Sequence, residues 1–513
     1  MYWSIYLYTI FGKRRGENYM NSRLVRLNVV SGVIGQFITI ILNFLIRSIF
    51  IRYLGSENVG LNGLYSNVLG VLSVAELGIG SAIVAHMYKP IADGDSKRIK
   101  LLMNIYRKVY KTIAWFLLVM GFILLPFISE VTKTYNGYYN VHVIFLMYVL
   151  NSFISFYIGY KQSIVIANGK SYVINKVTMM LFLPIALCQI ISLVVCQSFY
   201  LYMTLILINT LSLNIIITRY AKKTFSKQYF EKKEITKSDV TSILDYVKPM
   251  VMYRISGVVN SSTDSLIIAQ FISVLVTGLY TNYMMIVTAA QTLIRTGFSM
   301  ITASIGRMIN VADKEAVYKS FTNIINIGFI ISFIAVANFM GFVNGFVHVW
   351  AGPDSVLPTS TVLLLAINLY LTINSMPLVV YREATGCFVI RRYIPLIGAF
   401  INIGLSLALV VEFKIEGVLA ATAVARILTY FWSDPNAVIV HFFNRKILWY
   451  FVKYFVNAVC VFTLGYIYMY AMVDVSGVSE LLLKTLILIV VQLAMLALLN
   501  RPLVVKMVEN WRK

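Results

Sequence analysis

Long apolar stretches separated by short polar segments fill almost the whole chain. A helix that crosses a bilayer needs about 20 mostly apolar residues, because its backbone finds no water to bond in the hydrocarbon core. Fourteen stretches meet this requirement, with approximate cores at 27–50, 61–87, 110–130, 141–160, 177–196, 199–218, 248–271, 275–303, 320–345, 359–381, 393–412, 416–440, 449–472 and 480–500. The pattern therefore predicts an all-α integral membrane protein with about 14 transmembrane helices.

The seventh stretch, 248–271, is the least apolar of the fourteen. It carries Arg254 and Asp264, together with a run of Asn, Ser and Thr at positions 260–263. We retain it because Ile, Val and Leu fill most of its other positions, and because removing one crossing would disrupt the distribution of charge along the chain.

Basic residues indicate how the helices are oriented. With the N-terminus placed in the cytoplasm, 36 of the 44 Lys and Arg residues fall in inside segments, five at outside positions and three within spans. Cytoplasmic loops are enriched in Lys and Arg, so this bias predicts an even number of helices with both termini in the cytoplasm. The net charge of +23 then follows from topology, with anionic membrane lipids as its counterpart. No nucleic-acid partner is needed to explain it.

Composition excludes a water-soluble protein. Hydrophobic residues make up 59% of the chain, charged residues only 13%, and the mean hydropathy is +0.78, whereas soluble domains are about a quarter charged. The four cysteines lie in apolar stretches without metal-ligand spacing. The four histidines lie near span ends without a second ligand at helical spacing. The sequence therefore predicts neither a metal site nor catalytic residues.

The N-terminal residues and the loops limit the alternatives further. The apolar run Tyr2–Phe11 precedes the basic cluster Lys13–Arg15, the reverse of the order in a signal peptide, and either Met1 or Met20 is the expected start. The longest outside loop, about Phe346–Pro358, is too short to form a domain. This argues against an enzyme that polymerises or joins glycans, because such enzymes need a sizeable extracytoplasmic domain.

An internal repeat predicts how the helices are grouped. The segment Gly63–Asn67 (GLYSN) opens the second span and Gly278–Asn282 (GLYTN) opens the eighth, at an offset of 215 residues. Six crossings separate them, so the two halves form a parallel repeat about an axis along the membrane normal. We expect two six-helix lobes around a central cavity plus two C-terminal helices. The predicted units are an N-terminal tail at 1–19, lobes at 20–220 and 248–442, a basic linker at 221–247, and the last two helices with the tail at 443–513.

Polar residues at membrane depth predict where that cavity lies. Charged and strongly polar side chains within spans face the bundle interior or a water-filled space, since they are costly in lipid. Each of four helices carries one such stripe: Gln36, Asn43 and Arg47 in the first, Asn62, Ser66, Ser73 and Glu76 in the second, Arg254, Ser261, Asp264 and Ser265 in the seventh, and Met284, Gln291 and Arg295 in the eighth. We expect these helices to line the space between the lobes, as in an alternating-access transporter.

The arginines are the candidate anion-binding residues. Arg254 and Arg295 fall at matching depth in the cytoplasmic third of adjacent antiparallel helices, where they bind an anion or else extend to the inner headgroups. Arg47 lies near the outer end of the first helix, either in the cavity or at the interface. Arg426 has no polar stripe and is expected to pair with a neighbouring helix.

The remaining candidates are acids and sugar-binding groups. Glu76 and Asp264 are either structural partners of the arginines or carriers of a proton or cation. Asn, Gln and Tyr residues at membrane depth supply the donors and flat faces that sugars use, although Tyr is also a common interfacial residue. The candidates of this kind are Asn43, Asn260, Asn282, Gln291 and Tyr280.

Several segments resemble a known family. The matching segments are Arg52–Gly55 (RYLG), Gly60–Asn67 (GLNGLYSN) and Ala75–Ala82 (AELGIGSA) near the start, Asp264–Ile268 and Gly278–Tyr280 in the second lobe, and Trp432–Pro435 (WSDP). They are similar to motifs of the polysaccharide repeat-unit flippases of O-antigen and capsule type, in the multidrug/oligosaccharidyl-lipid/polysaccharide (MOP) exporter superfamily. The resemblance covers about residues 20–445.

The resemblance implies transport without covalent chemistry. The implied substrate is an undecaprenyl-diphosphate-linked oligosaccharide, moved from the inner to the outer leaflet of the bacterial cytoplasmic membrane for surface polysaccharide biosynthesis. A proton or sodium gradient would supply the energy, with no other cofactor. A polysaccharide polymerase and chain-length proteins are the implied protein partners. Arginine suits a diphosphate because its guanidinium binds phosphate oxygens in pairs.

Two rival functions remain. A multidrug antiporter of the same superfamily exports mostly lipophilic cations, for which an acidic cavity is expected, and the in-span arginines argue against it. A membrane glycan polymerase or ligase is disfavoured by the short outside loops and by the parallel repeat.

Overall fold

The structure is a computed structural model that describes residues 22–73, 79–231, 262–385, 393–471 and 477–499. The described chain is almost entirely helical, and it contains no strand. Nine helices in this part are long and apolar enough to cross a membrane. The chain is therefore a multi-pass membrane protein of the all-α class, as predicted.

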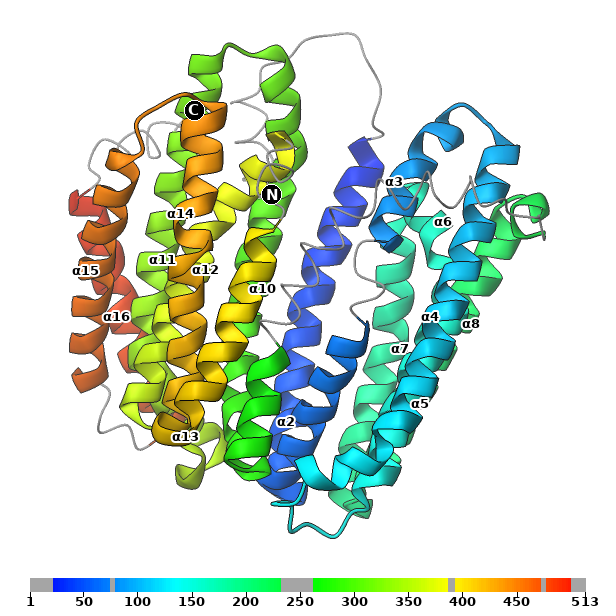
Figure 1. The fold of residues 1–513 in the computed structure, drawn as a ribbon, viewed down its shortest axis with the longest axis horizontal. Coiled ribbons are helices and arrows are strands. Elements are labelled where there is room, and N and C mark those ends of the chain that lie inside the picture. The colour runs from blue at the N-terminus through cyan, green and yellow to red at the C-terminus, as the bar shows by residue number, and fades with distance from the viewer. Residues whose placement is uncertain (1–21, 74–78, 232–261, 386–392, 472–476, 500–513) are drawn as a thin grey trace.

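The two halves of the chain lie side by side (Figure 1). The N-terminal half consists of α2 (Ser22–Leu72), α3 (Ile79–Ala92), α4 (Ser96–Val131), α5 (Val141–Gly159), α6 (Gln162–Ala167), α7 (Ser171–Ile191), η2 (Ser192–Cys196), α8 (Phe199–Thr224) and η3 (Lys227–Phe230). The C-terminal half consists of a helix at 262–271, α10 (Val274–Val311), α11 (Lys314–Ala351), η4 (Pro353–Ser355), α12 (Thr359–Thr385), α13 (Ile394–Leu428), α14 (Tyr430–Pro435), η5 (Asn436–Phe442), α15 (Leu448–Ala471) and α16 (Val478–Leu499).

Each of the fourteen predicted spans contains helix within the described residues. Two pairs of spans are continuous in the backbone assignment because their turns are very short. The break in α2 is at Gly55, with φ 81° and ψ 165°, and the break in α13 is at Lys414, with φ 50°. Gly55 adopts a conformation that only glycine reaches without steric cost, so the chain reverses there between its first and second crossings.

The observed helices extend beyond several predicted cores. The third span was predicted at 110–130, whereas α4 begins at Ser96. The added turns are amphipathic and charged, so a search for apolar runs does not detect them. Asp95 caps this extension, since its carboxylate accepts a hydrogen bond from the Arg98 backbone N–H at 3.0 Å.

Each half has its own apolar core. One cluster around Tyr65, Phe145 and Phe199 and another around Leu102 and Tyr106 fill the N-terminal half. A larger cluster fills the C-terminal half and includes α15 side chains such as Tyr450. The last two helices therefore pack on the second lobe, mainly against α11.

Polar contacts attach α15 to that lobe as well. Asn457 accepts a hydrogen bond from the Tyr370 hydroxyl at 3.0 Å and one from the Ser332 hydroxyl at 3.1 Å. Such bonds between helices substitute for water where none is available.

The two ends of the bundle differ in charge, because the helix turns next to one end carry many Lys and Arg residues, among them Lys97, Arg98, Lys222, Lys223, Lys314 and Lys319. We call one the basic end: it carries the start of α2 and the connections at 93–95, 168–170, 225–231, 312–313 and 443–447. It is uppermost in Figure 1. The opposite end carries the connections at 132–140, 197–198, 272–273 and 352–358. The chain alternates between the two ends in the order that the predicted crossings require.

Candidate functional site

The two halves meet along α2 and α10, where three glycines allow the backbones to touch. A Cβ atom at Gly60 would lie 2.0 Å from the Val274 carbonyl oxygen, and one at Gly278 would lie 2.2 Å from the Ser56 carbonyl oxygen. A Cβ at Gly63 would lie 2.4 Å from Thr281 Cγ2. At Gly60 and Gly278 the contact is backbone, so no side chain fits there, whereas a side chain at Gly63 would force Thr281 to move. We call this contact the glycine seam.

The repeated motif predicted from the sequence lies at this seam and contacts the other half in both directions. Asn67, the last residue of the first copy, donates through Nδ2 to Ser265 Oγ at 3.0 Å. Asn282, at the same position of the second copy, accepts from Arg47 Nε at 3.0 Å. Each copy therefore bonds to the helix that precedes the other copy, which is the arrangement expected of a parallel repeat.

Arg47 is held within the seam by neutral groups. In addition to Asn282, its Nη2 donates to Thr281 Oγ1 at 2.9 Å. Tyr148 and Tyr202 are the other polar groups that interact with it electrostatically, and Tyr148 also bonds to Asn62. The guanidinium thus lies among hydroxyl and amide oxygens rather than at the lipid interface. Asn43, one helical turn away on α2, is exposed.

The contacts between the halves gather toward the opposite end of the bundle. Within the described residues, the remaining hydrogen bond between them joins the Val274 N–H to Thr134 Oγ1 at 3.0 Å. The ring of Phe44 also packs 5.3 Å from that of Trp350. Figure 1 shows α2 and α10 meeting at the lower end of the view.

Asp264 lies in a buried group of oxygen atoms within the second lobe. Its two carboxylate oxygens are 3.2 and 3.3 Å from Thr422 Oγ1. Asn402 Nδ2 donates to that same hydroxyl at 2.9 Å, and Ser406 donates to Asn402 Oδ1 at 3.3 Å. Carboxylate, amide and hydroxyl oxygens from several helices are the ligands that hard cations prefer. We call these four residues, which form a buried chain of hydrogen bonds, the Asp264 cluster.

Arg426 lies next to the Asp264 cluster, and its contacts confirm the predicted pairing with a neighbouring helix. Its Nη1 donates to the Asn368 carbonyl oxygen on α12 at 3.2 Å and also bonds to Thr372. It attracts Asp264 electrostatically and is repelled by Arg295. Tyr280, buried on α10, also contacts Asp264. The carboxylate is thus partly compensated by a cation of its own lobe.

The other predicted residues divide into two groups. Arg295 is exposed on α10 and Gln291, one turn before it, is half-buried. Both lie on the helix that forms the seam, nearer to the basic end. Glu76, Arg254 and Asn260 lie outside the described residues.

Sequence reasoning missed a buried ion pair at the basic end of the second lobe. Arg382 on α12 pairs with Asp434 on α14, and their side chains are only 5% and 7% exposed. Asp434 belongs to the segment Trp432–Pro435 that carries the family resemblance, whereas Arg382 lies just beyond the predicted span 359–381. Reasoning also missed Asn402 and Ser406, although their spacing of four residues in an apolar helix was a detectable signal.

Comparison with known proteins agrees with this architecture. The sequence matches the family model described as "Polysaccharide biosynthesis protein" over residues 25–308, which is more than half of its 513 residues. No curated protein matches it.

Solved structures with a similar fold include a lipid flippase and multidrug transporters. Lipid II flippase MurJ, in an inward closed conformation, is similar over 92% of this chain and 99% of its own, with 15% identity and a TM-score of 0.67. An inward-facing multidrug resistance MATE family transporter of the MOP superfamily is similar over 77% of this chain and 94% of its own, with 14% identity and a TM-score of 0.58. A mutant of the Vibrio cholerae MATE transporter VcmN is similar over 81% and 96%, with 15% identity and a TM-score of 0.54.

Identities this low establish the fold alone, whereas the family model matches the sequence itself. Its range begins in α2 and ends in α10, so it includes both helices of the glycine seam and both copies of the repeated motif. The chain therefore belongs to the polysaccharide biosynthesis protein family and has the fold of MOP superfamily transporters.

Proposed function

We propose that this protein is a flippase that moves undecaprenyl-diphosphate-linked oligosaccharides across the bacterial cytoplasmic membrane by ion-coupled alternating access. The observation that carries the proposal is the charge of the helices between the lobes. Arg47 and Arg295 lie on α2 and α10, and the contacts of Arg47 are all with neutral groups. Cations arranged in this way attract a diphosphate and repel the lipophilic cations of a drug exporter.

The seam supports alternating access. Because the described contacts between the lobes gather toward the opposite end, the lobes can separate at the basic end without breaking them. Opening toward the other side would require the seam to part. The seam is held by few hydrogen bonds and by glycine contacts, so we expect it to part as the two packed lobes move apart as rigid bodies.

Reporter fusions test the topology on which the direction of transport depends. We expect fusions at Lys97, Lys170, Glu234, Lys314 and Arg392 to report a cytoplasmic location, because basic residues concentrate in those segments. Fusions at Asn136 and Asp354 should report an extracytoplasmic location. A single fusion on the wrong side would remove one crossing and break the parallel repeat.

The second prediction concerns Arg254 and Arg295 as the diphosphate site. Losing one charge-assisted hydrogen bond costs about 1.5–3 kcal/mol, so Arg295→Ala or Arg254→Ala should weaken substrate capture about ten- to a hundredfold. Lys at either position should restore only part of it, because it keeps the charge but loses the planar fork. The measurement is binding of lipid-linked oligosaccharide to the purified variants. Normal surface polysaccharide in cells that express only the double Ala variant would exclude the site.

The third prediction concerns energy coupling by Asp264 and Glu76. The Asp264 cluster offers oxygens from Asp264, Asn402, Ser406 and Thr422 to a sodium ion or a proton. We expect Asp264→Asn or Glu76→Gln to abolish gradient-driven transport while substrate binding stays largely intact. Thr422→Val should act in the same direction as Asp264→Asn. Normal gradient-driven transport by both acid variants would make these acids structural.

The proposal places the protein in surface polysaccharide assembly. Anionic lipids of the inner leaflet would neutralise its basic end. A polysaccharide polymerase and chain-length proteins would act on the flipped product.

A further inference from the structure

Four basic side chains converge on the flank of the N-terminal lobe, at its basic end. Arg107 and Lys111 lie one helical turn apart on α4, Lys161 connects α5 to α6, and Lys222 lies in the last turn of α8. Lys161 interacts electrostatically with all three of the others. We call these four residues the flank cluster.

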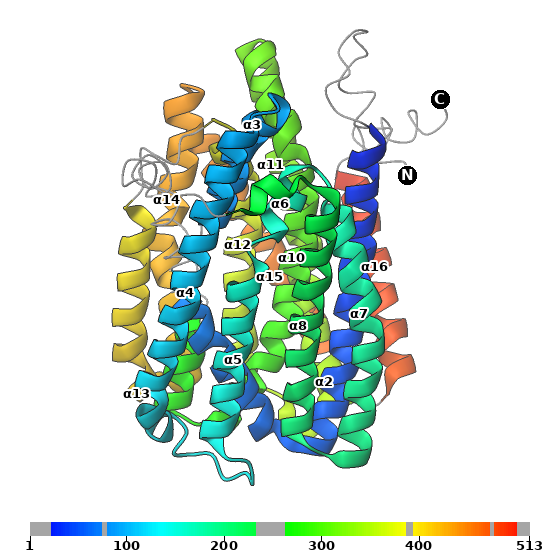
Figure 2. The ribbon, with the colours of Figure 1, turned by 90° about the vertical axis from the view of Figure 1, so that its right-hand side faces the viewer.

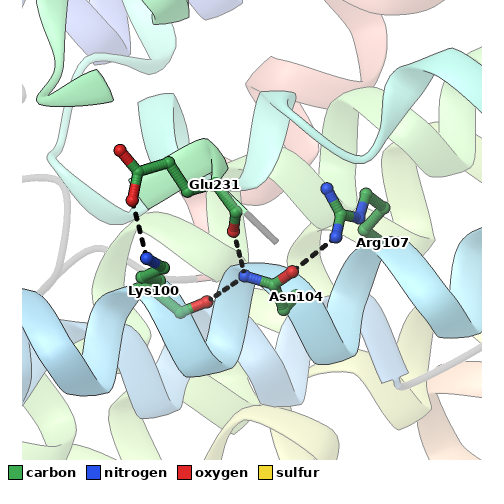
Figure 3. A network of polar contacts seen from close by, with 4 residues as sticks. All are labelled: Lys100, Asn104, Arg107 and Glu231. Carbon is green, nitrogen blue, oxygen red and sulfur yellow. Dashed lines mark hydrogen bonds and ion pairs between the residues drawn. The ribbon is translucent and has the colours of Figure 1, made fainter. Parts of the chain in front are cut away.

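Among the described residues, few acidic side chains lie near the flank cluster. No Asp or Glu occurs between Glu130 and Glu231, a stretch that contains α5 to α8 entirely. Glu231 itself is paired with Lys100 at 2.7 Å, as Figure 3 shows. In the same network, Arg107 Nη2 donates to Asn104 Oδ1 at 2.5 Å, which is a neutral acceptor. The only described carboxylate near these residues is therefore already neutralised.

The pKa of Lys161 reflects both its burial and the neighbouring positive charges. Burial, followed by the positive charges of Lys222, Lys111 and Arg107, lowers the pKa of this ammonium from 10.5 to about 8. Cations that repel one another in this way are stabilised when an anion binds among them.

Aromatic side chains continue from the flank cluster into the apolar surface of the lobe. Lys111 Nζ lies 3.3 Å from the Tyr157 hydroxyl and 4.5 Å from the centre of that ring. Tyr157 stacks on Phe153 at 5.2 Å, and Phe153 contacts Trp115 at 5.4 Å. Trp115 is 53% exposed, on a lobe surface that is otherwise apolar. Along α4 and α5, a cationic side chain is thus followed by a tyrosine and then by the rings of Phe153 and Trp115. A lipid has the complementary order, a charged headgroup followed by an apolar acyl chain.

The helices that carry the flank cluster lie at the edge of the N-terminal lobe, on the side away from the other half. Figure 1 shows α4, α5 and α8 at one edge of the molecule and α10 to α16 beyond α2, and Figure 2 shows the same three helices in front. A ligand on the outer surface of these helices approaches from the surrounding membrane rather than from the space between the lobes.

We propose that Arg107, Lys111, Lys161 and Lys222 bind the phosphate headgroup of an anionic phospholipid, whose acyl chain lies along Phe153 and Trp115. Guanidinium, ammonium and the Tyr157 hydroxyl supply donors for the phosphate oxygens. With the predicted topology the site is at the level of the inner leaflet, where anionic headgroups are available.

The test measures binding of short-chain phosphatidylglycerol to the full-length protein in a neutral detergent. The variant Lys161→Gln/Lys222→Gln removes two charges from the flank cluster, and Lys97→Gln/Lys223→Gln removes two exposed charges outside it. We expect the first variant to weaken binding about ten- to thirtyfold and the second to change it less than about threefold. Phosphatidylcholine and inorganic phosphate at equal concentration should bind at least about tenfold more weakly than phosphatidylglycerol to the unmodified protein.

Thermal unfolding controls for misfolding. Removing two mutually repelling lysines should not lower the melting temperature, whereas phosphatidylglycerol should raise it for the unmodified protein and for Lys97→Gln/Lys223→Gln only. Equal losses of binding in the two double variants would overturn the proposal, since binding would then depend on total charge. Binding of inorganic phosphate as tight as that of phosphatidylglycerol would also overturn the proposal. Transport of the oligosaccharide substrate provides the separate test of the proposed function.

Discussion

Gly278→Ala is expected to reduce transport at least about tenfold, although it adds only one methyl group. Its Cβ would lie 2.2 Å from the Ser56 carbonyl oxygen, which is backbone and cannot rotate away. Helices α2 and α10 must then separate by about 1 Å or more, and overpacking of this kind costs about 1–3 kcal/mol. Because the seam forms in one state of the cycle and parts in the other, the cost shifts the equilibrium between them by roughly five- to a hundredfold.

Gly297→Ala on the same helix is the matched control. No atom lies within 4 Å of the position of its Cβ. Alanine there should leave transport unchanged and stabilise α10 slightly, by up to about 1 kcal/mol. The conformational shift is measured by the distance between spin labels at Tyr138 and Asp354, two exposed positions at the opposite end. An unchanged distance distribution and normal transport in Gly278→Ala would mean that the seam does not open during the cycle.

Asp434→Ala is expected to lower the free energy of unfolding by about 3–5 kcal/mol. The carboxylate pairs with Arg382 where both side chains are almost fully buried, so its removal leaves a guanidinium charge in an apolar environment. Replacing both residues by apolar side chains of similar size, as in Arg382→Met/Asp434→Leu, should cost much less, since no uncompensated charge remains. Unfolding by heat or denaturant in detergent measures both effects.

An exposed ion pair provides the control for Asp434. Glu315 pairs with Arg445 at the basic end, where their side chains are 73% and 49% exposed. Water screens such a pair, so Glu315→Ala should cost no more than about 1 kcal/mol. Similar small losses for Asp434→Ala and Glu315→Ala would show that the Arg382 environment is more hydrated than its burial implies.

The fold was largely predictable because the bilayer imposes a simple rule on the sequence. Each crossing must be a long apolar helix, so hydropathy placed every predicted span where the described residues contain helix, including positions 262–271 of the polar seventh span. Helix ends were less predictable. The charged turns of α4 before residue 110 are stabilised by capping and by local contacts, which an apolar-run criterion ignores.

The candidate site was predictable in composition but less so in contacts. The repeat correctly indicated that Asn67 and Asn282 occupy equivalent places, yet nothing in the sequence specified that Arg47 bonds to Asn282, 235 positions away. The same limit applies to Asp434 and Arg382, because a buried pair is defined by the packing of two helices rather than by spacing along one. Long-range partners require the tertiary structure.

The central claim is that the protein transfers a lipid-linked oligosaccharide between leaflets, and flipping by the purified protein tests it most directly. Proteoliposomes carrying a fluorescent undecaprenyl-diphosphate oligosaccharide are treated with an impermeant quencher under an imposed sodium or proton gradient. We predict that quenching proceeds beyond the outer-leaflet fraction, and that the Arg254→Ala/Arg295→Ala variant quenches no further than protein-free vesicles. Quenching limited to the outer leaflet with the unmodified protein, together with gradient-driven uptake of a lipophilic cation, would contradict the claim and identify a drug exporter.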